Sequence, residues 1–118
     1  MIGGSEASQR VEYRIAAADI NPHIALAAAI GSGLWGIERQ IEPEAPIVGN
    51  AYDQDAGPAL ALPSTLWEAA QALRASAAAE DLFGAAFVDH YASTREWEER
   101  QARTAVTDWQ LARYFEII

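Results

Sequence analysis

The clearest local pattern is a strict alternation of charged and apolar residues near the beginning of the chain. Residues 10–15 read Arg-Val-Glu-Tyr-Arg-Ile, and a period of two is the spacing of side chains on one face of a β-strand. Arg10, Glu12 and Arg14 would then share one face, with the apolar side chains on the other. Because a single strand is not stable alone, we expect residues 10–15 to form a strand that pairs inside this chain or outside it.

The next segment is predicted to form a buried helix over residues 21–40. Asn21 is a favoured N-cap, and Pro22 fits the first helical position, where its missing N–H needs no partner. Apolar residues then occupy nearly every side of the helix, which is typical of a helix buried all round. Three glycines interrupt the segment, at Gly31, Gly33 and Gly36. Each weakens a helix by about 1 kcal/mol relative to Ala, so we interpret them as positions of close packing against a neighbour.

A loop and further helices are predicted for the rest of the chain. Residues 42–63 contain four of the five prolines, a composition that favours a long ordered loop. Thr65 and Glu68 have the spacing of a capping box and open a set of helices that we place in residues 65–116. Further helix starts are predicted at Ser76, Ala85 and Thr107. The predicted fold class is therefore mostly α, with one N-terminal β-strand followed by four to five helices.

The composition is that of a soluble globular chain and argues against several kinds of partner. Hydrophobic residues make up 51% and charged residues 21%, as in ordinary domains. The longest apolar run is broken by glycines and is too short for a membrane span of about 20 residues. A net charge of −9 argues against binding to nucleic acid or anionic membranes. Cysteine is absent and the first residues lack the features of a secretory signal, so we expect a cytoplasmic protein.

The charged face of the predicted strand is the main candidate for chemistry. A carboxylate between two guanidiniums, Glu12 between Arg10 and Arg14, can bind a hard divalent cation while the guanidiniums hold phosphate or carboxylate oxygens. Phosphoryl transfer needs such groups to neutralise the charge on the transferred phosphoryl. The alternative is a half-exposed strand whose charges pair with a neighbouring strand. His23 and His90 are the two histidines; they favour a packed and a surface position respectively, rather than a metal site.

Five further segments follow the charged strand in a characteristic order. Together with Arg10-Val-Glu-Tyr-Arg14 they are Ala18-Asp-Ile-Asn-Pro-His-Ile-Ala-Leu-Ala-Ala28, Gly33-Leu-Trp-Gly-Ile-Glu38, Gly49-Asn-Ala-Tyr52, Leu62-Pro-x-x-Leu-x-Glu-Ala69 and Val106-Thr-x-Trp-x-x-x-x-Tyr114. In order and spacing they resemble the C-terminal part of the catalytic domain of the glutamine synthetase family. The resemblance covers about residues 3–116. It implies that residues 1–118 are a C-terminal fragment of that α+β domain.

The resemblance also implies a role for each charged residue. Glu12 would be a ligand of the catalytic Mg or Mn ion, Arg10 would contact the phosphates of ATP, and Arg14 would stabilise the phosphoryl group in transfer. The reaction implied is ATP-dependent amide formation between glutamate and ammonia or an amine, through γ-glutamyl phosphate. ATP and the metal belong to the intact parent enzyme, and we expect none bound to this chain alone. The family also implies a homo-oligomer, and the isolated chain is expected to self-associate through pairing of residues 10–15 with a second copy.

Two departures from the family pattern indicate a divergent member. Ala16 and Ala17 stand where the family usually has Pro after the second arginine, and His23 stands where it usually has Tyr. The ending resembles the γ-glutamyl-polyamine ligase branch. The other metal ligands and the nucleotide loop have no counterpart here, so we expect the chain alone to be inactive. The competing hypothesis is a free-standing helical module that serves in interaction or oligomerisation without catalysis.

Overall fold

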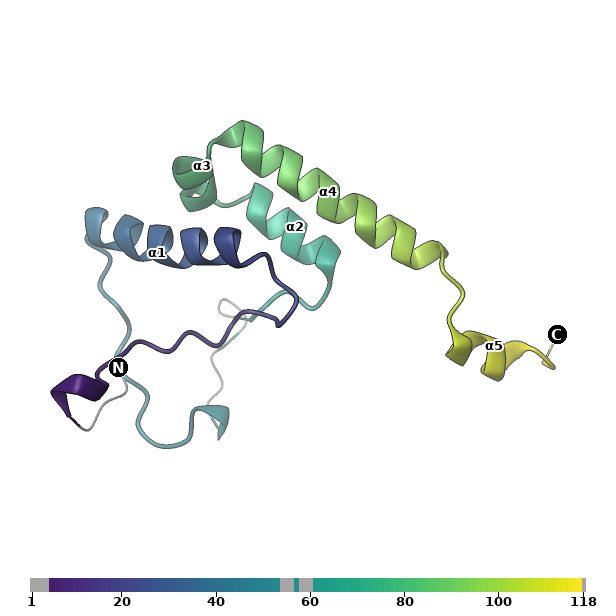
Figure 1. The fold of residues 1–118 in the computed structure, drawn as a ribbon, viewed down its shortest axis with the longest axis horizontal. Helices are drawn as coiled ribbons and strands as arrows, with labels where there is room; N and C mark the ends of the chain where they lie inside the picture. The colour runs from purple at the N-terminus through teal and green to yellow at the C-terminus, as the bar shows by residue number, and fades with distance from the viewer. Residues whose placement is uncertain (1–4, 54–56, 58–60, 118) are drawn as a thin grey trace.

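The ordered elements of the structure are helices (Figure 1). The computed structural model describes residues 5–53, 57 and 61–117. Its five α-helices are α1 (Pro22–Glu38), α2 (Leu66–Arg74), α3 (Ala77–Phe83), α4 (Ala85–Thr104) and α5 (Asp108–Tyr114). Two short 3-10 helices lie in the extended segments, at Glu6–Ser8 and Ala51–Asp53. None of the described helices is long and apolar enough to cross a membrane.

The predicted strand over residues 10–15 is wrong. These residues run as an extended segment in which Arg10 holds an isolated β-bridge, and the described part of the chain contains no β-strand. The apolar side chains of the alternation are open to solvent, with exposed fractions of 85% for Val11 and 58% for Ile15. The physical reason is that a strand needs ladder hydrogen bonds from a partner. No described residue makes a backbone hydrogen bond with residues 11–15.

Four predicted helix starts are confirmed by side-chain hydrogen bonds at the caps, whereas α4 begins at the predicted Ala85 after Gly84 without such a cap. The Asn21 side chain accepts from the backbone N–H groups of His23 at 3.0 Å and Ile24 at 3.3 Å. In the capping box of α2, the Glu68 N–H donates to Thr65 Oγ1 at 3.1 Å, and the Thr65 N–H donates to Glu68 Oε2 at 3.3 Å. Similar side-chain caps are made by Ser76 and Thr107. Local sequence signals therefore determine where the helices begin.

The helix predicted over residues 21–40 forms as α1, but none of its residues is buried. One face packs on α3, where a Cβ placed on Gly31 would lie 3.1 Å from both terminal carbons of Leu82. The close packing predicted for the glycines is thus confirmed at Gly31. Gly33 and Gly36 have no such neighbour, because a Cβ on either would meet no atom within 4 Å.

A small core lies where α2, α3 and α4 meet. α2 and α4 pack side by side, and α3 connects them at one end (Figure 1). The buried residues of the described chain are Ala70, Ala79, Val88 and Ala92. Small side chains at a helix crossing reduce the distance between the helix axes. Ala92, which is 0% exposed, therefore sets how closely α4 approaches its neighbours.

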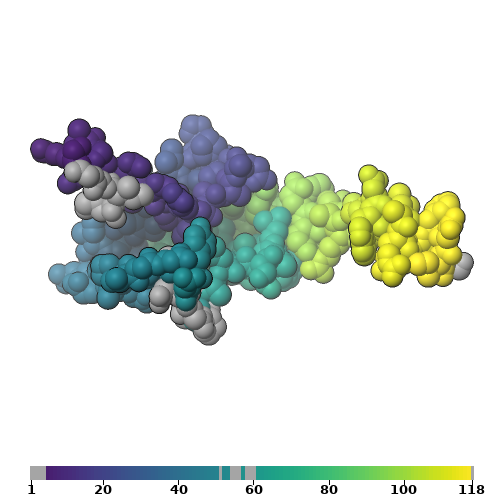
Figure 2. All heavy atoms as spheres, turned by 90° about the horizontal axis from the view of Figure 1, so that it is seen from below, coloured from purple at the N-terminus to yellow at the C-terminus, as the bar shows by residue number. Residues whose placement is uncertain are grey.

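The molecule is much more extended than a compact domain of the same length. Its radius of gyration is 19.0 Å, against about 13–14 Å for a compact chain of this size. Its accessible surface is 10253 Å² for a mass of 12.8 kDa, against about 6,300 Å² expected from that mass. α5 makes no contact with another described helix and stands apart at one end of the molecule (Figures 1 and 2). Much apolar surface therefore remains uncovered.

The close contact around Ala92 predicts that a larger side chain there is not tolerated. Ala92→Leu should lower the free energy of unfolding by about 1–3 kcal/mol, because added methyl groups force the packed helices apart. Ala102→Leu places the same side chain on an exposed position of the same helix and should change stability by less than about 0.5 kcal/mol. Urea unfolding followed by circular dichroism measures both variants. Equal stability of the two variants would contradict the packing described for α4.

Candidate functional site

Arg10, Glu12 and Arg14 lie together on the extended segment that precedes α1. Glu12 accepts a hydrogen bond from Nε of Arg14 through Oε1, and its Oε2 lies 3.9 Å from Nη2 of Arg10. Arg10 also donates from Nη1 to the carbonyl of Ser8 at 3.5 Å. The arginine side chains are 59% and 75% exposed, and that of Glu12 is 31% exposed. The carboxylate is thus held between two guanidiniums that solvent can reach; the chemical roles of the three residues stay predictions.

Glu12 can offer a cation one carboxylate, and the described residues do not complete a metal site around it. No group of three or more His, Cys, Asp or Glu side chains that could hold an ion occurs among them. His23 and His90 are exposed and belong to no such group. A hard divalent cation takes about six oxygen ligands. A cation at Glu12 therefore requires ligands from outside the described part of this chain.

A second charged cluster, which the sequence analysis missed, joins α2 to α4. Arg74 donates to Glu96 Oε1 at 3.1 Å and to Ser93 Oγ at 2.7 Å. It also forms an ion pair with Asp89. Gln71, on the preceding turn of α2, donates to the same Glu96 oxygen at 2.7 Å. The three partners on α4 follow one another at helical spacing on one face, and that spacing is the signal available in the sequence.

The electrostatics of this cluster favour its charged forms. The hydrogen bond from Arg74, with a smaller contribution from Gln71, lowers the pKa of Glu96 from its usual 4.5. The same hydrogen bond is the main cause that raises the pKa of Arg74. Both side chains are partly shielded from water, at 15% exposed for Glu96 and 29% for Arg74. Because the donors and acceptors satisfy one another across two helices, we interpret the cluster as structural.

A third polar contact anchors α1 to α3. Asp81 Oδ2 accepts from Trp35 Nε1 at 2.9 Å and from Arg39 Nη2 at 2.8 Å. The Arg39 guanidinium also lies 5.4 Å from the centre of the Trp35 ring, within the range of a cation–π interaction. The indole hydrogen bond is the main cause that lowers the pKa of Asp81, and the charge of Arg39 adds to it. This contact holds the C-terminal half of α1 in place.

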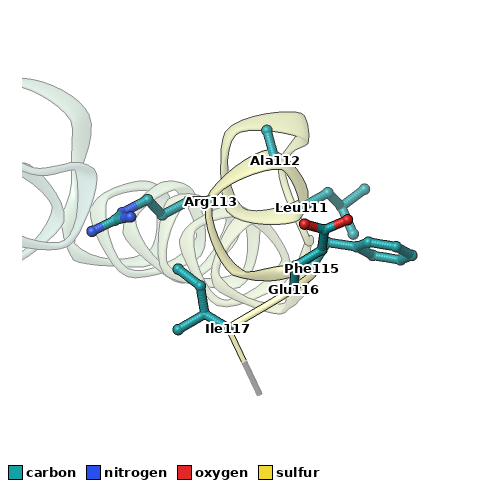
Figure 3. Close-up of a pocket in the computed structure, with 6 residues that line it drawn as sticks. All are labelled: Leu111, Ala112, Arg113, Phe115, Glu116 and Ile117. Atoms are coloured by element: carbon teal, nitrogen blue, oxygen red, sulfur yellow. The ribbon is translucent and has the colours of Figure 1, made fainter.

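The surface hollows among the described residues are open rather than enclosed. The hollow at α5 is lined by residues 111–113 and 115–117 of one short stretch (Figure 3). There Arg113 points away from Leu111 and Phe115, so the polar groups do not converge. A cleft beside the first half of α1 is lined by Tyr91 and Arg95 of α4, by Asp19 and Asn21, and by apolar side chains of α1 and α2. The hollow at α5 lacks the converging polar groups that are typical of a small-molecule site.

Comparison with known proteins identifies the class to which this chain belongs. The family model described as glutamine synthetase, catalytic domain, matches residues 1–114. Glutamate–isopropylamine ligase of a Pseudomonas species is 44% identical over 117 residues, covering 99% of this chain and 26% of that protein. Type-1 glutamine synthetase 2 of Dictyostelium discoideum is 41% identical over 120 residues, with coverages of 100% and 23%. The chain therefore belongs to the glutamine synthetase family, as its motifs predicted.

A third relative is named for a different amide product. Gamma-glutamylethanolamide synthetase of Streptomyces coelicolor is 40% identical over 113 residues, covering 96% of this chain and 24% of that protein. The chain thus spans about a quarter of the length of these relatives. No solved structure matches it.

The α2–α4 cluster predicts a pH-dependent contribution of Glu96 to stability. The pKa of Glu96 is lowered on folding, so its ionised form stabilises the fold in full at a pH well above 4.5. This contribution is lost as the pH falls through 4.5 toward the lowered value. Glu96→Gln should therefore destabilise the chain clearly at neutral pH, and the difference from the wild type should shrink below about pH 4.5.

Urea unfolding at a series of pH values, with both proteins in the same buffers, measures this difference. Glu98→Gln is the matched control, because Glu98 is an exposed carboxylate of the same helix that forms no ion pair with another described residue. The control should follow the wild type at every pH. A Glu96→Gln effect that is equal at neutral and acidic pH would show that the charge of Glu96 does not hold α2 to α4.

Proposed function

We propose that this chain is the C-terminal part of a glutamine-synthetase-like catalytic domain and contributes to an ATP-dependent carboxylate–amine ligase. The observation that carries the proposal is the family match over residues 1–114, which includes the exposed group formed by Arg10, Glu12 and Arg14. The ligases named among its relatives act on isopropylamine or form an ethanolamide. We therefore propose glutamate and ammonia or a small primary amine as the substrates.

The proposed reaction proceeds in two steps. A γ-carboxylate oxygen of glutamate attacks the terminal phosphorus of ATP, and ADP leaves. The neutral amine nitrogen then attacks the γ-carbonyl carbon, and the amide forms as phosphate leaves with the proton that the nitrogen loses. Negative charge accumulates on the transferred phosphoryl group, and guanidiniums stabilise it because their fork of N–H donors matches phosphate oxygens. We assign Arg14 to the phosphoryl group in transfer and Arg10 to the nucleotide phosphates.

Glu12 is proposed as one ligand of the Mg or Mn ion that the reaction requires. The fit is partial, because Glu12 offers a single carboxylate and the described residues supply no further cluster of ligands. The two arginines neutralise this carboxylate in the structure. Binding of phosphate by the guanidiniums would therefore release Glu12 for the cation.

The chain alone is expected to be inactive, because its relatives are about four times as long and its own residues form an incomplete site. We propose that the complete enzyme is a homo-oligomer that acts in the cytoplasm. A non-catalytic interaction module is the competing proposal, and the large apolar side chains that the described helices expose are the observation that favours it.

A chimera with a relative tests the proposed function directly. This chain replaces the aligned segment of the Pseudomonas glutamate–isopropylamine ligase, and ATP-dependent formation of the γ-glutamyl amide is measured. We expect activity in the chimera, and a loss of at least about 100-fold on Glu12→Gln or Arg14→Gln. The first removes the proposed metal ligand, and the second removes a charge placed at the transferred phosphoryl group. The isolated chain should release no more phosphate from ATP than its own Glu12→Ala variant.

Glu98→Gln in the same chimera is the control and should leave the rate unchanged, because it removes a carboxylate on the exposed face of α4. A folded chimera without activity, or one in which Glu12→Gln and Arg14→Gln keep the full rate, would contradict the roles assigned here. Turnover by the isolated chain above its Glu12→Ala variant would contradict the incomplete site.

A further inference from the structure

The cleft beside the first half of α1 combines an apolar lining with two opposite charges. It lies where α1 faces the start of α2 and the middle of α4 (Figure 1). Its volume is about 570 Å³, within the range of about 300–1,000 Å³ that is typical of small-molecule sites. Arg95 contributes a positive charge to the lining, and Asp19 contributes a negative charge. The apolar residues that line the cleft are Ile20, Ile24, Ala25, Ala28 and Leu66.

Aromatic rings, rather than a carboxylate, hold the Arg95 guanidinium in place. It lies 5.3 Å from the centre of the Tyr91 ring, within the range of a cation–π interaction. The Tyr91 ring in turn stacks on Phe87 at 5.7 Å, and Phe87 contacts Phe83 at 5.3 Å, so the four side chains form a row at intervals of four residues.

The other N–H donors of Arg95 are open to an anion. Its Nε donates to Thr94 Oγ1 at 3.3 Å, and Arg95 forms no ion pair with a described residue. The side chain is partly buried, so solvent screens its charge less than that of a fully exposed arginine. A guanidinium that is already fixed loses little freedom when its fork of donors binds a carboxylate.

Asp19 decides which kind of ligand fits the cleft. It is exposed and forms no ion pair with a described residue, Arg95 included. A ligand that carries only a carboxylate is attracted by Arg95 and repelled by Asp19, and a ligand that carries only an ammonium group experiences the reverse. A zwitterion brings a partner to each charge, while its apolar part covers the apolar lining.

We propose that this cleft binds a small zwitterion with an apolar body, a class represented by α-amino acids with a branched aliphatic side chain. The carboxylate of the ligand binds Arg95, its ammonium group binds Asp19, and its side chain lies on the apolar residues of α1. The proposal makes no use of Arg10, Glu12 or Arg14, and it therefore goes beyond the proposed function.

Three probes of similar shape test the two charges in the isolated chain. Free L-leucine carries both charges, 4-methylpentanoate lacks the amino group, and 3-methylbutylamine lacks the carboxylate. Each probe is titrated into the isotope-labelled chain, and the amide chemical shifts of the first half of α1 are followed by NMR. We expect a dissociation constant on the order of 1 mM for leucine, as for so small a ligand in an open cleft. The other two probes should bind at least about tenfold more weakly.

Variants at the two charges test the same assignment from the side of the protein. Arg95→Gln should weaken leucine binding at least about tenfold. Arg113→Gln is the matched control, because Arg113 also lies near a tyrosine ring, 5.9 Å from the centre of Tyr114, but lines the hollow at α5 instead; it should leave the affinity unchanged. Asp19→Asn should remove the preference for leucine over 4-methylpentanoate, an effect that a purely structural role of Asp19 would not produce.

A second pair of variants keeps every charge and changes only the space in the cleft. Ala25→Leu fills the cleft and should abolish the leucine-dependent shifts, while helix content by circular dichroism stays unchanged because leucine is also a good helix former. Ala27→Leu adds the same side chain at an exposed position of α1 that does not line the cleft. This variant should bind leucine as the natural chain does.

Equal affinity for the three probes, or equal binding by the Ala25→Leu and Ala27→Leu variants, would overturn the proposal. The chimera with the Pseudomonas ligase extends the test to the longer protein. There, Arg95→Gln should again weaken leucine binding at least about tenfold. A chimera whose affinity for leucine is the same with and without Arg95 would show that the cleft is not a binding site in the longer protein, and would overturn the proposal as well.

Discussion

The close contact between α2 and α4 supports the rest of the described structure. The buried alanines Ala70 and Ala92 bring these helices together, and Arg74 binds three side chains of α4 across the contact. α3 closes one end of this pair, and α1 is attached through α3. The attachment of α1 depends on Gly31 against Leu82 and on the Asp81 contact. The remaining segments have little apolar contact to hold them.

Local features of the fold could be predicted from the sequence because they depend on neighbours along the chain. Asn21, Thr65, Ser76 and Thr107 cap the helices that they were predicted to cap. The strand predicted over residues 10–15 does not form, since alternation indicates which faces a strand would have and not whether a partner supplies its hydrogen bonds. The burial predicted for α1 is not found either, because burial depends on contacts with elements that are distant along the chain. Long-range contacts therefore account for both differences.

The candidate site, too, could be predicted only where it depends on residues that are close together in the sequence. The grouping of Arg10, Glu12 and Arg14 could be predicted, because residues two apart in an extended segment come close together. The α2–α4 cluster around Arg74 was missed, because the way in which two helices cross decides which of their side chains meet. Residues 89, 93 and 96 nevertheless lie on one helical face, and their spacing can be read from the sequence. The chain spans about a quarter of the length of its relatives, and the roles proposed for Arg10, Glu12 and Arg14 depend on that longer protein.

Hydrogen–deuterium exchange of the α1 amides tests most directly whether this chain is one part of a larger catalytic domain. It is measured in the isolated chain and in the chimera with the Pseudomonas ligase. The account predicts that α1 exchanges much faster than the amides around Ala92 in the isolated chain, because one face is open to water. In the chimera, α1 should exchange at least about tenfold more slowly while the amides around Ala92 change less. Equal protection of α1 in both proteins would contradict the account.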